Sequence, residues 1–128
     1  MEHPIVEKIL RDGVKAVNLS MLDEKTRKSI LEDVGEKLYR QGKFEEAILV
    51  IAEARDFEKL IKLGDSFLSE GKSELAVLCF IPAKDKERLN CAAVNCIQAK
   101  NYKLAARAYE AADNGQMASF IMENFAYN

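Results

Sequence analysis

The chain has 128 residues, of which 48% are hydrophobic and 31% are charged, the proportions of an ordinary globular protein. Nineteen Lys and Arg side chains stand against 21 Asp and Glu side chains, and the net charge of −2 offers no electrostatic footprint for nucleic acid or for an anionic membrane. The first residues lack the pattern of a secretory signal, and every apolar run is too short to span a bilayer. We therefore expect one cytoplasmic domain, residues 1–128, that binds neither nucleic acid nor membrane.

The first predicted helix covers residues 4–12. Pro4 suits the first position of a helix, and an apolar face follows it along the segment. A second helix is expected over residues 14–21, so that residues 4–22 form an N-terminal hairpin whose pattern has decayed. Ser20 and Asp23 could then start the next helix before Glu24.

From residue 41 onward a short sequence motif recurs along the chain. QGKFEEAI begins at Gln41, EGKSELAV at Glu70 and AKNYKLAA at Ala99, so the three starts are evenly spaced. We therefore expect three units, at about residues 29–57, 58–86 and 87–115. The first half of each unit carries apolar or small residues at positions i, i+3, i+4 and i+7, which is one face of a helix. These residues are Leu31, Val34, Gly35 and Leu38, then Leu60, Leu63, Gly64 and Phe67, then Leu89, Ala92, Ala93 and Cys96.

A turn and a second helix complete each unit. Gly42 and Gly71 suit a left-handed helix end, and Lys100 takes that place in the third unit. Small residues at fixed places let two helices approach closely, while large ones fill the space between them. The small residues are Ala47, Ala76 and Ala105; the large ones are Ile51, Phe80 and Tyr109; the residues expected to cap the following helix are Asp56, Asp85 and Asn114.

Residues 116–127 are expected to form a last helix that caps the stack. Met122 stands where the earlier units have Gly or Ala, so this helix should dock differently. A single helical hairpin cannot bury its own apolar face, whereas stacked hairpins bury each other's. The predicted fold is therefore an all-α stack of antiparallel helical hairpins.

The units resemble the tetratricopeptide repeat. The second unit reproduces that family's spacing at Leu60, Leu63, Gly64, Phe67, Ala76 and Phe80, and Gly71 and Ala83 match as well. The repeat interval here is 29 residues, from Gln41 to Glu70, against roughly 34 in the family, and the closing Pro is absent. The resemblance covers residues 29–114 and implies a right-handed α-solenoid, a superhelix of shortened, degenerate repeats. It also implies that the first helices line a groove that binds a peptide or protein.

Transferred by position, the groove would carry ten side chains. They are Glu32, Glu36, Tyr39 and Arg40 from the first unit, Ile61, Asp65 and Leu68 from the second, and Asn90, Val94 and Ile97 from the third. The family's best-known groove grips a C-terminal carboxylate with cations and Asn, which these places lack. The expected role is a protein–protein interaction adaptor. The alternative is a self-assembling structural unit, a homo-oligomer with no foreign ligand. The apolar residues of the groove would then be covered by a second copy of the chain, or by the chain's own C-terminal helix.

Nothing in the sequence indicates catalysis. The chain has a single histidine, His3, so we expect no Ser–His or Cys–His catalytic pair. The six glycines form no phosphate-binding loop. Three cysteines, an odd number, indicate reduced and mostly buried thiols, and too few soft ligands accompany them for a zinc site. We therefore expect no enzyme activity, no metal and no cofactor.

Overall fold

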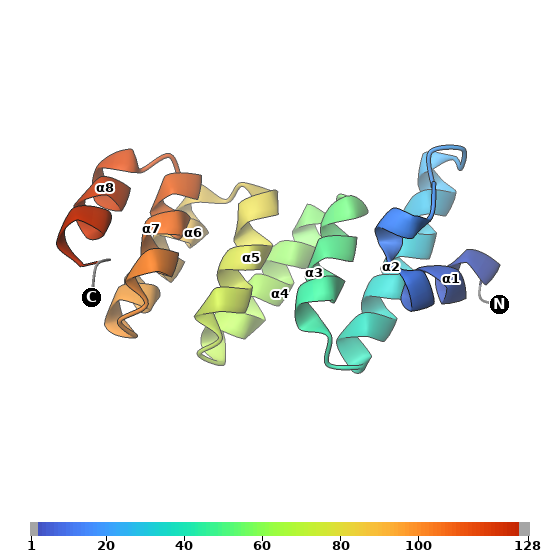
Figure 1. Cartoon of the computed structure of the whole chain (residues 1–128), viewed down its shortest axis with the longest axis horizontal. Helices are drawn as coiled ribbons and strands as arrows, with labels where there is room; N and C mark the ends of the chain where they lie inside the picture. The colour runs from blue at the N-terminus through green and yellow to red at the C-terminus, as the bar shows by residue number, and fades with distance from the viewer. Residues whose placement is uncertain (1–2, 126–128) are drawn as a thin grey trace. The chain divides into compact units, whose positions relative to one another are not determined.

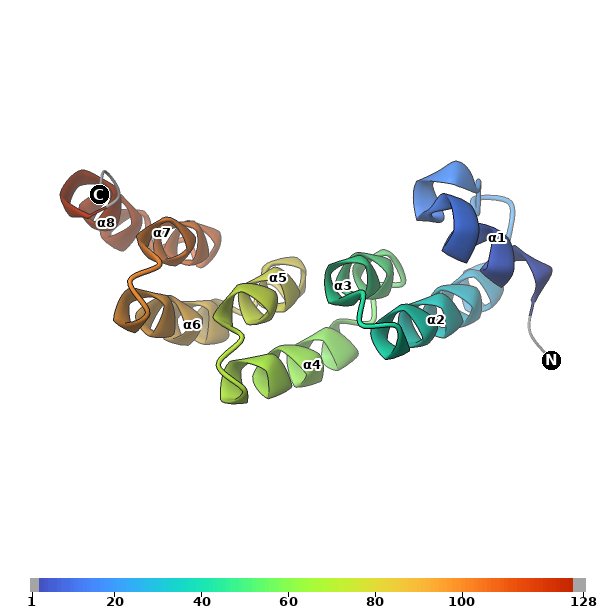
Figure 2. The same ribbon diagram turned by 60° about the horizontal axis from the view of Figure 1, so that its bottom comes forward.

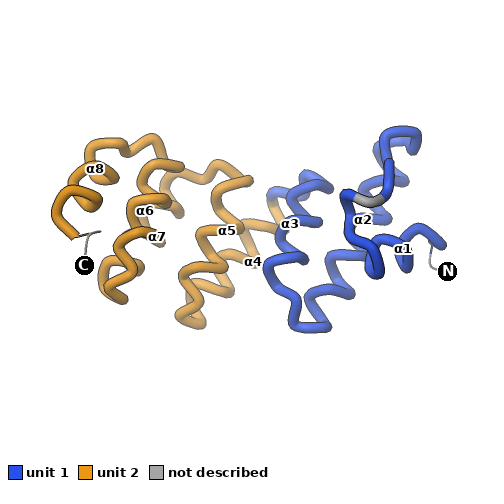
Figure 3. Tube along the Cα trace, viewed as in Figure 1, with its two compact units in different colours: residues 1–57 blue, residues 58–128 orange. Residues whose placement is uncertain are grey.

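The computed structural model describes residues 3–125, except for the side chain of Ala16, and within that range the chain forms eight α-helices and no strand (Figure 1). The predicted all-α class is confirmed. The chain divides into two compact units, residues 1–57 and residues 58–128 (Figure 3). None of the described helices is both long enough and apolar enough to cross a bilayer.

The first unit consists of α1 (Pro4–Asp12), a one-turn 3₁₀-helix η1 (Val14–Ala16), α2 (Glu24–Arg40) and α3 (Phe44–Glu53). Pro4 opens α1 as predicted, and Asp23 caps α2 by accepting a hydrogen bond of 2.6 Å from the Thr26 backbone N–H. The core of this unit is formed by apolar side chains of α1, α2 and α3, among them Val6, Val34 and Val50.

The helix predicted over residues 14–21 is wrong. Only η1 forms there, because the Asn18 side chain accepts hydrogen bonds from the Ser20 backbone N–H (3.0 Å) and from its hydroxyl (2.6 Å). Such local side-chain bonds compete with the helical backbone ladder. The segment still serves the core, since Val17 and Leu19 pack against it in a non-helical conformation. Asp23, rather than Ser20, starts α2.

The second unit consists of α4 (Phe57–Ser69), α5 (Ser73–Ala83), α6 (Lys86–Gln98), α7 (Tyr102–Ala111) and α8 (Gly115–Asn124). Successive helices pack as neighbours from α5 to α8, and α5 also contacts α7. Within this unit α4 and α6 lie along one side, and α5 and α7 lie along the other (Figure 2). The C-terminal helix predicted over 116–127 is confirmed as α8 up to Asn124, and residues 126–127 lie outside the described range.

Six helix ends share one turn. A residue just past each helix takes a positive φ, and the next N–H donates to a carbonyl five positions earlier, which closes the helix as in a Schellman motif. The predicted left-handed conformation of Gly42 and Gly71 is confirmed, with φ of 78° at both. Lys100 adopts it as well, with φ of 63°. The turns that follow the second helices of the hairpins carry Arg55, Lys84 and Asp113 at this position, with φ of 59°, 54° and 59°.

The small residues of the second helices lie at the centre of each hairpin. Ala47, Ala76 and Ala105 are all fully buried, as predicted. Asp85 and Asn114 cap α6 and α8 through the backbone N–H groups of Arg88 and Met117, also as predicted.

Candidate functional site

The ten predicted groove residues fall in both units. Glu32, Glu36, Tyr39 and Arg40 lie on α2 in the first unit, whereas the other six lie on α4 and α6 in the second. On each helix three of them stand at i, i+4 and i+7, beside the buried stripe that forms the hairpin core. None of the ten is fully buried.

Three of the four α2 residues contact side chains of their own unit. Arg40 forms an ion pair of 2.5 Å with Glu36, one turn earlier on the same helix. The Tyr39 ring packs against Phe44 at the start of α3, with ring centroids 5.1 Å apart and planes tilted by 59°. Tyr39 therefore helps to hold the α2–α3 turn, while its remaining surface is exposed.

The apolar part of the predicted site lies on α4 and α6. Ile61, Leu68 and Ile97 are half-buried, and Val94 is 48% exposed. About half of the Val94 surface is therefore left in water by α8 and the other described residues. A β-branched apolar side chain with half its surface in water is a candidate anchor for a partner, because burying apolar surface provides about 25 cal/mol per Å².

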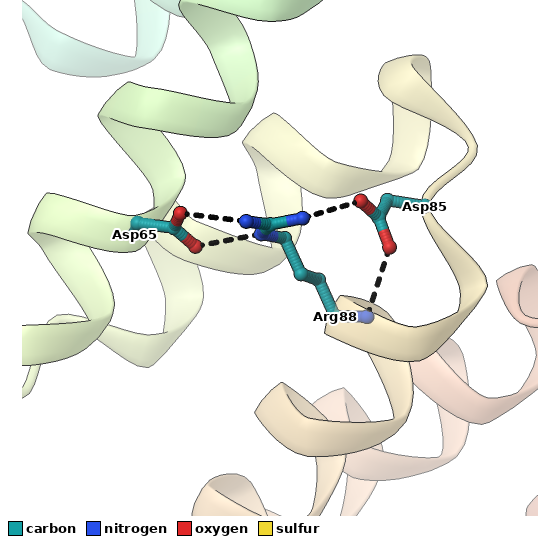
Figure 4. Close-up of polar contacts among 3 residues, drawn as sticks. All are labelled: Asp65, Asp85 and Arg88. Atoms are coloured by element: carbon teal, nitrogen blue, oxygen red, sulfur yellow. Dashed lines mark hydrogen bonds and ion pairs between the residues drawn. The ribbon is translucent and has the colours of Figure 1, made fainter.

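A charged bridge joins α4 to α6, and Figure 4 shows its three residues. The Arg88 guanidinium donates to both carboxylate oxygens of Asp65, at 2.8 Å from Nε and 3.0 Å from Nη2, and to Asp85 at 2.9 Å from Nη1. Asp85 in turn accepts from the Arg88 backbone N–H at 3.1 Å. One side chain thus connects two neighbouring first helices and completes a helix cap.

The bridge sets the protonation behaviour of its members. The hydrogen bond from the Arg88 backbone N–H, followed in importance by its guanidinium, holds the pKa of Asp85 below its usual value. The pKa of Arg88 is raised, first by Asp65 and then by Asp85. Asp65 is therefore already paired within its own unit.

Arg88 is the residue of this site that sequence reasoning missed. Asp65 and Arg88 are 23 residues apart, and Lys59 and Met117 hold the places that correspond to Arg88 one repeat earlier and one repeat later, so the pattern gives no signal for the pair. The only available indication was the Asp85–Arg88 spacing at the start of α6, which fits a capped helix.

Asn90 also faces another element of its unit. Its side-chain oxygen accepts a hydrogen bond of 3.4 Å from Nδ2 of Asn114, the residue that caps α8. Asn90 therefore links α6 to the start of α8. The apolar residues are thus the part of the predicted site that remains for contact with a partner.

The three thiols are unpaired, with Cys79 and Cys96 buried as expected and Cys91 exposed. Burial raises the pKa of Cys79 to about 12 and also raises the pKa of Cys96, where Glu74 adds a smaller effect. Neither buried thiol is poised as a nucleophile, because the thiolate is the reactive form. Between residues 3 and 125, no group of three His, Cys, Asp or Glu side chains is arranged to hold a metal ion.

Comparison of the chain with protein-family models, with curated proteins and with solved structures finds no match in any of the three.

Proposed function

We propose that the chain is a non-catalytic protein–protein interaction module of the tetratricopeptide-like kind, a right-handed solenoid whose first helices bind a peptide or protein. The observation that carries the proposal is the partly exposed apolar set on α4 and α6, Ile61, Leu68, Val94 and Ile97, which lies beside a fully buried stripe on the same helices. Buried apolar anchors provide most of the affinity at protein interfaces.

The recurrence of turns and buried small residues supports the solenoid part of the proposal. Positive φ returns at Gly42, Gly71 and Lys100, and complete burial returns at Ala47, Ala76 and Ala105, always at the same repeat interval. Equal spacing of both features is what stacked, near-identical hairpins require.

Two carboxylates of the proposed site are already engaged in ion pairs. Glu36 is paired with Arg40, and Asp65 is paired with Arg88, so a partner's basic groups would compete with existing ion pairs. We therefore expect the apolar contacts to decide affinity, and the paired charges to guide orientation.

The test compares two leucines in one calorimetric experiment. Leu68→Glu is expected to weaken binding of a copurifying partner at least tenfold, because it places a charge among the apolar anchors. Leu49→Glu is the matched control, since Leu49 is exposed and lies on α3 of the other unit. Circular dichroism checks that both variants are folded. Full-strength binding by a folded Leu68→Glu variant would contradict the proposal, and so would unfolding by this change, since Leu68 would then belong to the core.

A further inference from the structure

The last helix, α8, leaves open the side that the earlier first helices cover with their own second helix. A Cβ atom on Gly35 of α2 would lie 3.0 Å from Ile51 of α3, and one on Gly64 of α4 would lie 2.4 Å from Phe80 of α5. The residue at the same place on α8 is Met122, and its side chain is 42% exposed. The side of α8 that should receive a helix therefore receives none from the described residues.

A second position in the repeat is also buried in the earlier units and partly exposed at α8. Leu38, Phe67 and Cys96 occupy one place on α2, α4 and α6, and all three are buried. Phe125 takes the corresponding place one repeat after Cys96, just past the end of α8, and is 36% exposed. Its ring stacks on Tyr102 at a centroid distance of 5.0 Å and meets the exposed Phe120 ring at 6.0 Å. Phe125 therefore extends the open side beyond Met122, whereas Phe120, two residues before Met122 on the helix, projects from the opposite face of α8.

The charge in the pocket beside Met122 is of one sign. A shallow pocket beside Met122 is lined by Gly115, Ala118 and Ser119 and by two carboxylates, Glu110 and Glu123. No Lys or Arg lines it, and within residues 3–125 neither carboxylate forms an ion pair. The aliphatic stem of a partner's Lys or Arg would lie on Met122 and Ala118, with its cationic end between the two carboxylates.

We propose that this open side of α8, formed by Met122, Phe125 and the pocket between Glu110 and Glu123, binds an amphipathic helix of a partner protein whose apolar stripe is flanked by Lys or Arg. The surface is separate from the α4–α6 site, so it can bind a second segment. A helix is the fitting occupant because α3 and α5 fill this position on α2 and α4.

A second copy of the chain fits the surface poorly. The apolar stripes of α3 and α5 are buried within their own units, as Ile51 and Phe80 show. A symmetric contact between two α8 helices would also bring Glu110 and Glu123 of one copy toward those of the other, and like charges across an interface are unfavourable.

The experiment uses the full chain and two synthetic helical peptides with the same Leu and Ala stripe, one flanked by Lys and the other by Glu. Fluorescence anisotropy at low and high salt is expected to show that the Lys peptide binds at least tenfold more tightly. Met122→Asp should weaken that binding at least tenfold, and Glu123→Lys should weaken it more at low salt than at high salt. Met21→Asp is the matched control, because Met21 is 90% exposed in the other unit. Leu68→Glu should leave peptide binding unchanged, which separates this surface from the α4–α6 site.

Three outcomes would overturn the proposal. They are equal affinity for the two peptides or binding of neither, Lys-peptide binding that survives both Met122→Asp and Glu123→Lys, and sedimentation of the wild type as a dimer that Met122→Asp dissociates. The last outcome would assign the surface to a second copy of the chain.

Discussion

The hairpins α2–α3 and α4–α5 use the same residue types at the same places, but their packing leaves different amounts of room. In the first, a Cβ atom on Gly35 would meet Cγ1 of Ile51 at 3.0 Å. In the second, a Cβ atom on Gly64 would meet three atoms of the Phe80 ring, at 2.4, 2.8 and 2.9 Å. The repeated Gly therefore fixes where two helices cross, whereas the opposing side chain decides how strictly Gly is required.

The same two hairpins differ in how they use a carboxylate at one shared place. Glu36 pairs with Arg40 of its own helix, whereas Asp65 pairs with Arg88 of the next first helix in its unit. The first pair adds only to local helix stability, and the second connects elements far apart in the sequence. Equal position in a repeat thus does not imply an equal structural role.

The largest predicted effect separates the two glycines. Gly64→Ala should lower the free energy of unfolding by about 2 kcal/mol, because Phe80 is completely buried and its ring cannot move aside. Gly35→Ala should change the free energy by less than about 1 kcal/mol, since the better helix propensity of Ala offsets a small displacement of Ile51. Urea unfolding of both variants measures the difference.

A double variant with a smaller side chain at position 80 provides the control for this pair of substitutions. Gly64→Ala combined with Phe80→Leu should lose less stability than the sum of the two single changes, because the added methyl group then has space. Equal losses for Gly35→Ala and Gly64→Ala would show that the two crossings are equally tight.

The next effect concerns the left-handed turns. Gly71→Ala should lower the free energy of unfolding by about 1 kcal/mol, since its φ of 78° disfavours any side chain although the space around it is open. Lys100→Gly should raise it by up to about 1 kcal/mol, because Lys100 already occupies the same conformation with a Cβ atom. Thermal unfolding of both variants tests this, and a destabilised Lys100→Gly variant would contradict it.

The smallest expected effect is the difference in stability between variants of Arg88 and Arg40. Arg88→Gln should destabilise the second unit, and the loss should shrink as salt screens the bridge to Asp65 and Asp85. Arg40→Gln should have no measurable effect, as expected for an exposed pair within one helix. Unfolding at low and high salt compares the variants, and a salt-independent loss for Arg88→Gln would indicate a packing role for its side chain instead.

Acid adds a second measurement on the same bridge. The pKa of Asp85 is lowered in the folded chain, first by the backbone N–H of Arg88, so its contribution to stability is present above the unfolded value of about 4. That contribution is lost as the pH falls through the lower, folded value. Asp85→Ser keeps a cap but no charge, and this variant should lose less stability than the wild type on acidification.

Local features of the fold could be predicted from the sequence, and long-range ones could not. The turns at Gly42 and Gly71 and the burial of Ala76 follow from residue type and spacing. Lys100 shows that the unit imposes its turn even where the favoured residue is missing. The helix expected over residues 14–21 failed because the Asn18 side chain provides an alternative to helical hydrogen bonds.

The candidate site was predictable in its apolar half only. Val94 and Leu68 could be placed beside the core stripe by counting along a helix. The Asp65–Arg88 pair could not, because it joins two helices through side chains whose meeting depends on how those helices pack.

The most direct test of the interaction proposal is site-specific photo-crosslinking from Val94 in the cells that produce the protein. A photoreactive amino acid at Val94 should give one discrete heavier product that contains a different protein, and Leu68→Glu should remove it. The same amino acid at Met21, which is 90% exposed, should not give that product. Products that are identical from both positions, or that contain only a second copy of the chain, would contradict the account.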